Sequence, residues 1–93
     1  YLPQKSDARA TTLRSLEADS RSHARTQVFI ETPYRNEAML ETLSSALAPA
    51  TRVCVARDLT LAEESIVTLP VREWRGRPRE PYARRPAIFL LQA

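Results

Sequence analysis

Glycine is almost absent from this sequence of 93 residues, in which Gly76 stands alone. The scarcity excludes a glycine-rich loop, with which many nucleotide-binding proteins cradle phosphate groups. Cysteine and histidine occur once each, as Cys54 and His23, so no internal disulfide can form and a structural zinc site is not expected. We therefore expect no metal, an exposed His23 and a buried, inert Cys54 thiol.

Long apolar runs are missing as well. No stretch approaches the roughly 20 residues of a membrane-spanning helix, and the chain does not start with the charged and apolar segments of a secretion signal. We therefore expect no binding to a membrane, and the single cysteine fits a reducing, cytoplasmic setting. The first residue is not methionine, which leads us to expect a fragment of a longer protein.

Lysine is nearly absent from the basic residues, since Lys5 is the only one and the net charge is +3. Guanidinium groups suit phosphate, so an arginine-rich segment between residues 72 and 85 could bind RNA. Gly76, Pro78 and Pro81 interrupt this segment, which favours a solvated loop instead. We prefer the solvated loop, because a modest overall charge is not typical of a nucleic-acid binder. The six arginines are Arg72, Arg75, Arg77, Arg79, Arg84 and Arg85.

Two helices are predicted in the first half of the chain, which at 43% hydrophobic residues is typical of one small globular domain. The first helix lies within residues 1–20, is capped by Ser6 or Asp7, and has a thin apolar stripe that suits an outer surface. The second follows a strand at residues 26–31. Its buried face comprises Met39, Leu40, Leu43, Ala46 and Leu47.

Three further strands are predicted at residues 51–59, around 65–69 and at 86–93. The last is apolar nearly throughout, which predicts burial on both of its faces. The expected fold is therefore α/β (α+β), with a single mixed β-sheet of about four to five strands covered by two main helices.

The junction between the first strand and the second helix reads Glu31-Thr32-Pro33-Tyr34-Arg35. A helix start leaves free backbone N–H groups, and this edge of a sheet is where α/β proteins often bind ligands. On one interpretation Glu31 accepts hydrogen bonds there, and Tyr34 and Arg35 lie near the ligand. On the other, Thr32 and Pro33 only begin the helix and Arg35 pairs with Glu31. The residues alone leave both interpretations open.

Four short motifs follow one another along the chain: "YLPQK" at residues 1–5, "IETPYR" at 30–35, "ARDLTLAEE" at 56–64 and "PAIFLL" at 86–91. Together, and in this order, they resemble the carboxyl-terminal half of the tetrapyrrole methylase superfamily. Residues 30–35, "IETPYR", resemble the family's "YESPHR", and residues 56–64, "ARDLTLAEE", resemble "ARELTKLHEE". The start "YLPQK" is similar to the family's "FLPxK", and "PAIFLL" at residues 86–91 is similar to its closing strand. The resemblance covers essentially the full chain. It is greatest to the branch of ribosomal RNA small subunit methyltransferase I.

The resemblance implies an enzyme of two α/β domains that transfers a methyl group from S-adenosylmethionine, bound in the cleft between them. Residues 1–93 would be the carboxyl-terminal domain, with the amino-terminal domain absent. Lys5, Tyr34 and Arg35 would face the methyl acceptor, an rRNA or a tetrapyrrole-like molecule. No catalytic residue is implied, and a homodimer is expected. The backbone contacts to the cofactor would come from Ile30, Glu31, Ala56, Arg57, Pro86 and Ala87.

The sequence departs from that branch in two places, with Tyr34 where the branch has histidine and no glycine after Ile66-Val67. Three hypotheses follow for the function. The first is half of a methyltransferase, inactive by itself because positioning carries much of the catalysis. The second is a non-enzymatic domain that binds RNA or protein through the Arg72–Arg85 segment. The third is a dimerisation domain.

Overall fold

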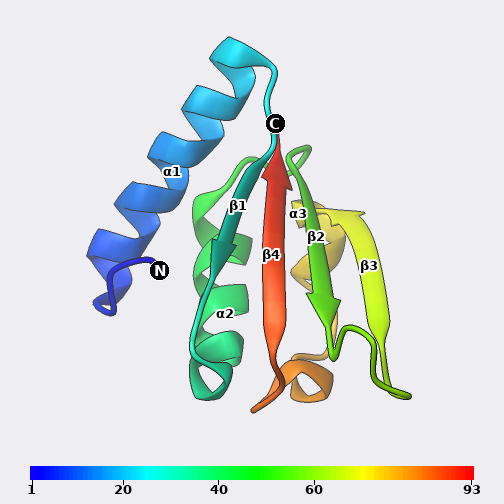
Figure 1. The fold of residues 1–93 in the computed structure, drawn as a ribbon. Helices are drawn as coiled ribbons and strands as arrows, with labels where there is room; N and C mark the ends of the chain where they lie inside the picture. The colour runs from blue at the N-terminus through cyan, green and yellow to red at the C-terminus, as the bar shows by residue number, and fades with distance from the viewer.

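Four strands form one sheet in the order β1-β4-β2-β3 in the computed structural model, which describes residues 1–93 (Figure 1). The strands are β1 (Gln27–Ile30), β2 (Arg52–Arg57), β3 (Ser65–Pro70) and β4 (Ala87–Gln92). The α-helices are α1 (Ser6–His23), α2 (Asn36–Ala46) and the one-turn α3 (Val71–Trp74). Two 3-10 turns, η1 (Pro33–Arg35) and η2 (Glu80–Tyr82), complete the fold. The predicted α/β class with a single sheet is confirmed.

All three strand pairings are antiparallel, so the prediction of a mixed sheet is wrong. β1 and β2 run in the same direction, as a strand–helix–strand unit predicts. However, β4 lies between them in the sheet and runs the opposite way (Figure 1). No two parallel strands are therefore neighbours, and β3 joins the sheet as the second strand of a hairpin with β2.

The covered face of the sheet forms the core together with α2 and α3. Its residues alternate along each strand, as the period of two requires, and Phe29 of β1 stacks on Phe89 of β4 with ring centroids 5.4 Å apart. On α2, the predicted core side chains are buried, except that Ala46 is half-buried. The sheet contributes the buried side chains of Phe29, Val53, Val55, Phe89 and Leu91.

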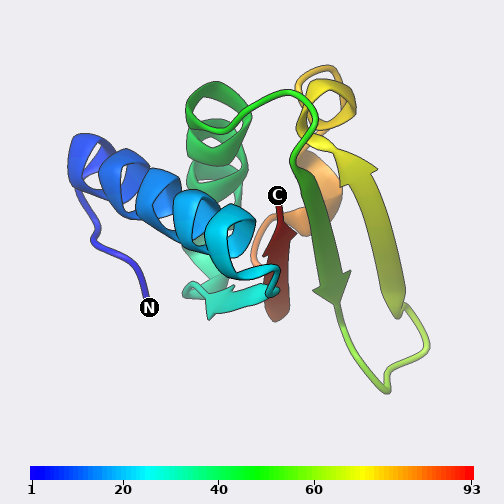
Figure 2. The same ribbon diagram turned by 90° about the horizontal axis from the view of Figure 1, so that it is seen from above.

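The other face of the sheet carries no helix (Figure 2). Val28 and Ile66 on this face are 62% and 59% exposed. Ile88 and Leu90 of β4 are half-buried, so the prediction that this strand is buried on both faces is wrong. Cys54 also lies on the open face and is half-buried rather than buried. An apolar strand pattern does not distinguish a covered face from an open apolar one.

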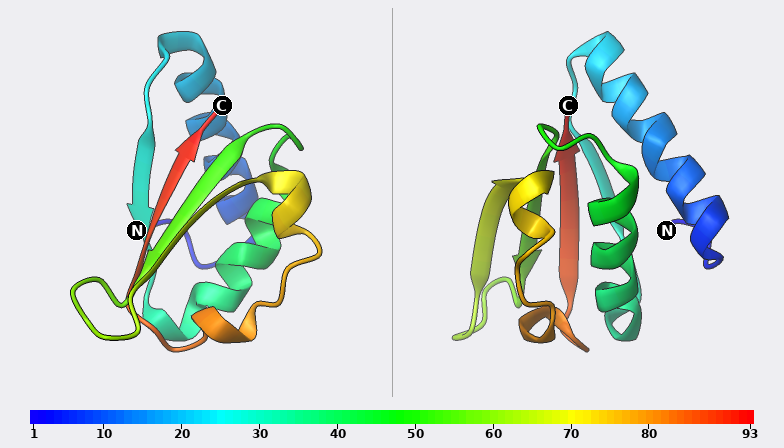
Figure 3. Two further views of the ribbon diagram at one scale, coloured as in Figure 1. Left: turned by 90° about the vertical axis from the view of Figure 1, so that its right-hand side faces the viewer. Right: turned by 180° about the vertical axis from the view of Figure 1, so that it is seen from behind.

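α1 lies at the β1 side of the sheet and packs against α2 (Figure 3). Its apolar contact is narrow, as predicted, but Leu13 is fully buried. The buried carboxylate of Glu17 anchors the helix further, because it accepts hydrogen bonds from Ala48 N–H at 2.8 Å and from the Thr51 hydroxyl. None of the helices combines the length and the apolar character needed to cross a membrane.

The start of α1 differs from the prediction. Lys5 occupies the position before the first helical residue, and no side chain caps the first turn. Ser6 and Asp7 are themselves helical, and the Asp7 carboxylate accepts a hydrogen bond from the neighbouring Ala8 N–H at 2.9 Å. The helix is therefore held by its tertiary contacts rather than by a capping side chain.

The end of α1 is tied to β1 by the carboxylate of Asp19. It lies 3.0 Å from Nδ1 of His23, which is exposed as expected, and 2.9 Å from Nε of Arg25. Desolvation raises the pKa of Asp19, but hydrogen bonds from Arg25 and Gln27, together with the charges of Arg25 and His23, outweigh it. The pKa of this carboxyl therefore lies below its ordinary value.

Ala24 ends α1 in the left-handed conformation, with φ 50° and ψ 47°, a position where glycine is favoured. We expect Ala24→Gly to raise the free energy of unfolding by about 1 kcal/mol, since the Cβ strain disappears. The matched change Ala18→Gly, at an exposed position inside α1, should lower it by about 1 kcal/mol. Urea titrations of both variants measure the difference, and equal losses would contradict the assignment of this helix end.

Candidate functional site

Three chain segments meet at the end of the sheet where β1 and β2 end and β4 begins. Ile30 pairs with Ile88 across β1 and β4. The N–H of Asp58 donates to the carbonyl of Pro86 at 2.9 Å, and the N–H of Arg84 donates to the carbonyl of Pro33 at 3.1 Å. The motifs around Thr32, Ala56 and Pro86, far apart in the sequence, therefore lie side by side as their resemblance predicts.

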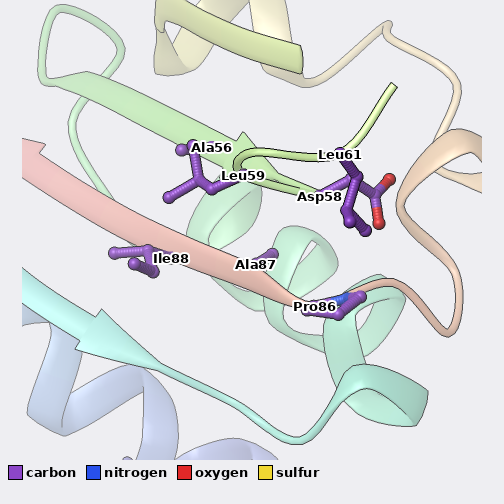
Figure 4. A pocket seen from close by; sticks show the side chains of 7 residues that line it. All are labelled: Ala56, Asp58, Leu59, Leu61, Pro86, Ala87 and Ile88. Atoms are coloured by element: carbon purple, nitrogen blue, oxygen red, sulfur yellow. The ribbon is translucent and has the colours of Figure 1, made fainter. Parts of the chain in front are cut away.

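A pocket of about 290 Å³ lies at this meeting point, on the open face of the sheet (Figure 4). The loop after β2 projects toward the open side, away from the helices, and supplies Leu59 and Leu61 (Figures 2 and 4). Five of the seven lining residues are hydrophobic, so the pocket suits a flat apolar group. The complete lining is Ala56, Asp58, Leu59, Leu61, Pro86, Ala87 and Ile88.

The six residues predicted to contact the cofactor are brought to one end of the sheet, in different surroundings. Ala56, Pro86 and Ala87 line the pocket itself. Ile30 lies beside it, because it pairs with Ile88 and is 38% exposed on the same open face. The side chain of Arg57, the next residue after Ala56, points to the covered face, and its Nη1 lies 2.8 Å from Oδ2 of Asp58. The sixth residue, Glu31, is buried at the end of β1.

The Glu31 carboxylate holds the turn that starts η1. Its Oε1 accepts hydrogen bonds from the N–H of Thr32 at 2.8 Å and from Nη1 of Arg35 at 3.3 Å. Thr32 and Pro33 occupy the predicted positions at the helix start, although the Thr32 side chain makes no capping bond. The pairing of Arg35 with Glu31, which belongs to one of the two interpretations left open by the sequence, is thus present.

The three residues predicted to face the methyl acceptor are not all brought together. Arg35 lies over the ring of Tyr34, 5.0 Å from its centroid, and Tyr34 is 64% exposed. The exposed Tyr34 ring and the half-buried Arg35 therefore lie together beside the pocket end of β1. Lys5 precedes α1, whose start lies away from the end of β2 and the start of β4 (Figure 1).

Asp58 is a further residue of this site; it stands within the motif at residues 56–64 but is not among the predicted contact positions. Its side chain is 3% exposed, and Oδ2 accepts hydrogen bonds from Nη1 of Arg57 and Nη1 of Arg85, both at 2.8 Å. The backbone has φ 54°, a conformation that aspartate adopts more readily than most residues. Asp58 thus joins the end of β2 to the segment that leads into β4.

The arginine segment 72–85 is more ordered than the predicted solvated loop. Nε of Arg75 donates to the carbonyl of Ser44 at 2.7 Å, at the end of α2, and Arg79 pairs with Glu41 at 3.1 Å. Together with the pair between Arg85 and Asp58, three of the six arginines have partners inside the molecule. These internal contacts leave fewer charges free for RNA than the sequence indicates.

Comparisons with known proteins find similarity in structure only. No protein-family model matches the sequence, and no curated protein matches it. The crystal structure of the methyltransferase CobJ superposes on this chain with a TM-score of 0.53 and 18% identity. The match covers 88% of this chain and 34% of CobJ, so the chain spans about a third of that protein's length. At 18% identity, the similarity to CobJ shows a shared fold and nothing more specific.

Proposed function

We propose that this chain is the carboxyl-terminal domain of an S-adenosylmethionine-dependent methyltransferase of the tetrapyrrole methylase superfamily. The pocket between Ala56, Leu61 and Ile88 would be one wall of its cofactor site. The observation that carries this proposal is the meeting of the three motif segments at a single apolar pocket. The fold shared with the methyltransferase CobJ supports it.

The chemistry of the pocket fits part of the cofactor. Its apolar lining suits the faces of an adenine ring, while the Asp58 carboxylate in the lining is held by Arg57 and Arg85 and keeps the loop in place. A volume of about 290 Å³ is at the small end for a complete small-molecule site. A second wall is therefore needed, and the 93-residue chain by itself is expected to lack methyltransferase activity.

Within this proposal, the residues of the chain bind and orient rather than react. S-adenosylmethionine, when bound, supplies a methyl group activated by its sulfonium. The backbone at Ile30 and Glu31, with the other predicted contact positions, would hold its nucleoside and amino-acid ends. Tyr34 and Arg35 would meet the acceptor, because a ring and a guanidinium suit either a nucleotide of rRNA or a tetrapyrrole-like molecule with carboxylates. A cytoplasmic homodimer is part of the same proposal.

Binding of S-adenosylhomocysteine to the 93-residue chain tests the proposal. We expect amide shifts in ¹H–¹⁵N spectra that cluster at residues 30–31, 56–61 and 86–88. Leu61→Glu should weaken binding by about fivefold or more, because it replaces apolar contact with a charge. Ile66→Glu is the matched control, since Ile66 is similarly exposed on the same face but does not line the pocket. It should leave the affinity unchanged within twofold.

Two outcomes would contradict the proposal. One is the absence of localised shifts at millimolar ligand, and the other is an equal loss of affinity in the two glutamate variants. Salt-dependent RNA binding without any binding of S-adenosylhomocysteine would favour the alternative, a non-enzymatic domain that uses the Arg72–Arg85 segment.

A further inference from the structure

Another pocket, of about 300 Å³, lies on the covered side of the sheet where β2 ends and β3 begins. Arg57 and Ser65 are direct partners in the pairing of these strands, and Tyr82 comes from η2, drawn in orange beside the lower strand ends in Figure 3. Its lining comprises Arg57, Ser65, Arg77, Pro78, Pro81 and Tyr82, and contains no acidic side chain. Two guanidinium groups and no carboxylate therefore line this pocket.

Two buried aromatic rings hold the two arginines of this pocket in place. The Arg57 guanidinium lies over the Tyr82 ring at 5.8 Å from its centroid, and that of Arg77 lies over the Trp74 ring at 5.6 Å. The two rings are 2% exposed and meet edge to face with centroids 5.7 Å apart. Trp74 is fixed in turn, because its Nε1 donates to the carbonyl of Val53 at 2.9 Å. The guanidinium groups are thus positioned before a ligand arrives.

The arginines of the pocket retain donors that no protein group uses. Nη1 of Arg57 donates to Oδ2 of Asp58 at 2.8 Å and to the carbonyl of Glu63 at 2.9 Å, but its Nη2 makes no hydrogen bond. Nε of Arg57 is buried without a partner. Arg77 forms no ion pair, unlike Arg79 and Arg85 in the same segment. An uncompensated guanidinium beside a pocket without acidic side chains favours an anion.

We propose that this pocket binds a phosphate group. Arg77 and Nη2 of Arg57 donate charge-assisted hydrogen bonds to two of its oxygens, and the Ser65 hydroxyl reaches a third. Donors on two strands and a separate loop line the same pocket, an arrangement that suits a tetrahedral phosphate better than a planar carboxylate. The inference does not depend on the proposed function, and a free phosphate ester or the backbone of an RNA presents the same group.

Titration of the 93-residue chain with inorganic phosphate at constant ionic strength tests the inference. We expect amide shifts confined to residues 57, 65 and 77–82. Arg77→Gln should raise the dissociation constant by about tenfold or more, because one charge-assisted hydrogen bond is lost. Arg77→Lys keeps the charge without the planar fork and should give an intermediate value. Arg72→Gln, an exposed arginine outside the pocket, removes the same charge and should change the constant by less than twofold.

The source of the phosphate is decided by a second titration, with a short single-stranded RNA. If Arg77→Gln weakens RNA binding and Arg72→Gln does not, the pocket binds the phosphates of an RNA. If the RNA does not bind while inorganic phosphate does, the ligand is a small phosphate ester. Equal effects of Arg77→Gln and Arg72→Gln on phosphate binding, or shifts located elsewhere, would overturn the inference.

Discussion

Replacing Asn36 with aspartate is expected to bring the protein close to unfolding at pH 7. Asn36 is fully buried at the start of α2, and its Nδ2 donates to the carbonyls of Tyr82 and Arg85 at 2.9 and 2.6 Å. Aspartate would lose both hydrogen bonds and place a carboxylate against two carbonyl oxygens. The expected loss is about 4 kcal/mol, a large part of the stability of a small domain.

The pH dependence of unfolding distinguishes this mechanism from a loss of packing. Burial beside two carbonyls raises the pKa of the introduced carboxyl above its unfolded value, so the variant should recover stability as the pH falls from 7 toward 4. Asn36→Leu should lose about 2–3 kcal/mol at every pH in that range, because it leaves the two carbonyls unpaired without adding a charge. The exposed change Glu37→Gln should cost less than about 1 kcal/mol. If denaturant titration gave equal stability for Asn36→Asp and the wild type, the two hydrogen bonds of Asn36 would not contribute to stability.

Asp58→Asn is expected to have the second largest effect, a loss of about 2–3 kcal/mol in the free energy of unfolding. The carboxylate is buried and accepts from two arginines, so a neutral amide leaves both guanidinium groups without their counter-charge. This expected loss is smaller than that for breaking a fully buried ion pair, because the Arg85 side chain is 42% exposed. Asparagine tolerates the φ of 54° at this position, so backbone strain does not contribute.

Amide hydrogen exchange gives a local readout of the same change. The Asp58 N–H donates to the Pro86 carbonyl, and the Leu61 N–H donates to the Asp58 carbonyl. Both amides should exchange faster once the ion pairs of Asp58 are weakened. Arg84→Gln is the control, since Arg84 is exposed and forms no ion pair, and it should shift stability by less than about 0.5 kcal/mol. Combining Asp58→Asn with Arg85→Gln should cost less than the sum of the two changes. Strict additivity would argue against a shared ion pair.

The periodicity of the sequence was sufficient for the type and order of the main elements. Alternation in residues 26–31 separated Val28 from Phe29 without saying which of them is buried, whereas the helical spacing of Met39, Leu40 and Leu43 marked the buried face of α2. The motif resemblance was sufficient to predict that the segments around Thr32, Ala56 and Pro86 lie close together. These features depend on neighbours a few residues apart, or on whole motifs, and both are visible along the chain.

The sequence does not reveal which polar groups become partners across long separations. Asn36 reads as one polar residue at a helix start, although it contacts residues 46 and 49 positions away. Arg75, Arg79 and Arg85 read as one basic run, yet they bind the end of α2, Glu41 and Asp58. Such contacts depend on where the η2 segment packs, which no local pattern encodes.

By itself, the sequence determined the α/β class, the strand and helix order, and the buried face of α2. Only the tertiary structure decided that β4 lies between β1 and β2, that one apolar face stays open, and that Arg57 and Arg77 meet at one pocket. The physical reason is the range of the interactions. Side-chain periodicity is set by the local backbone, whereas strand neighbours and charge partners are chosen among all the surfaces that the folded chain brings together.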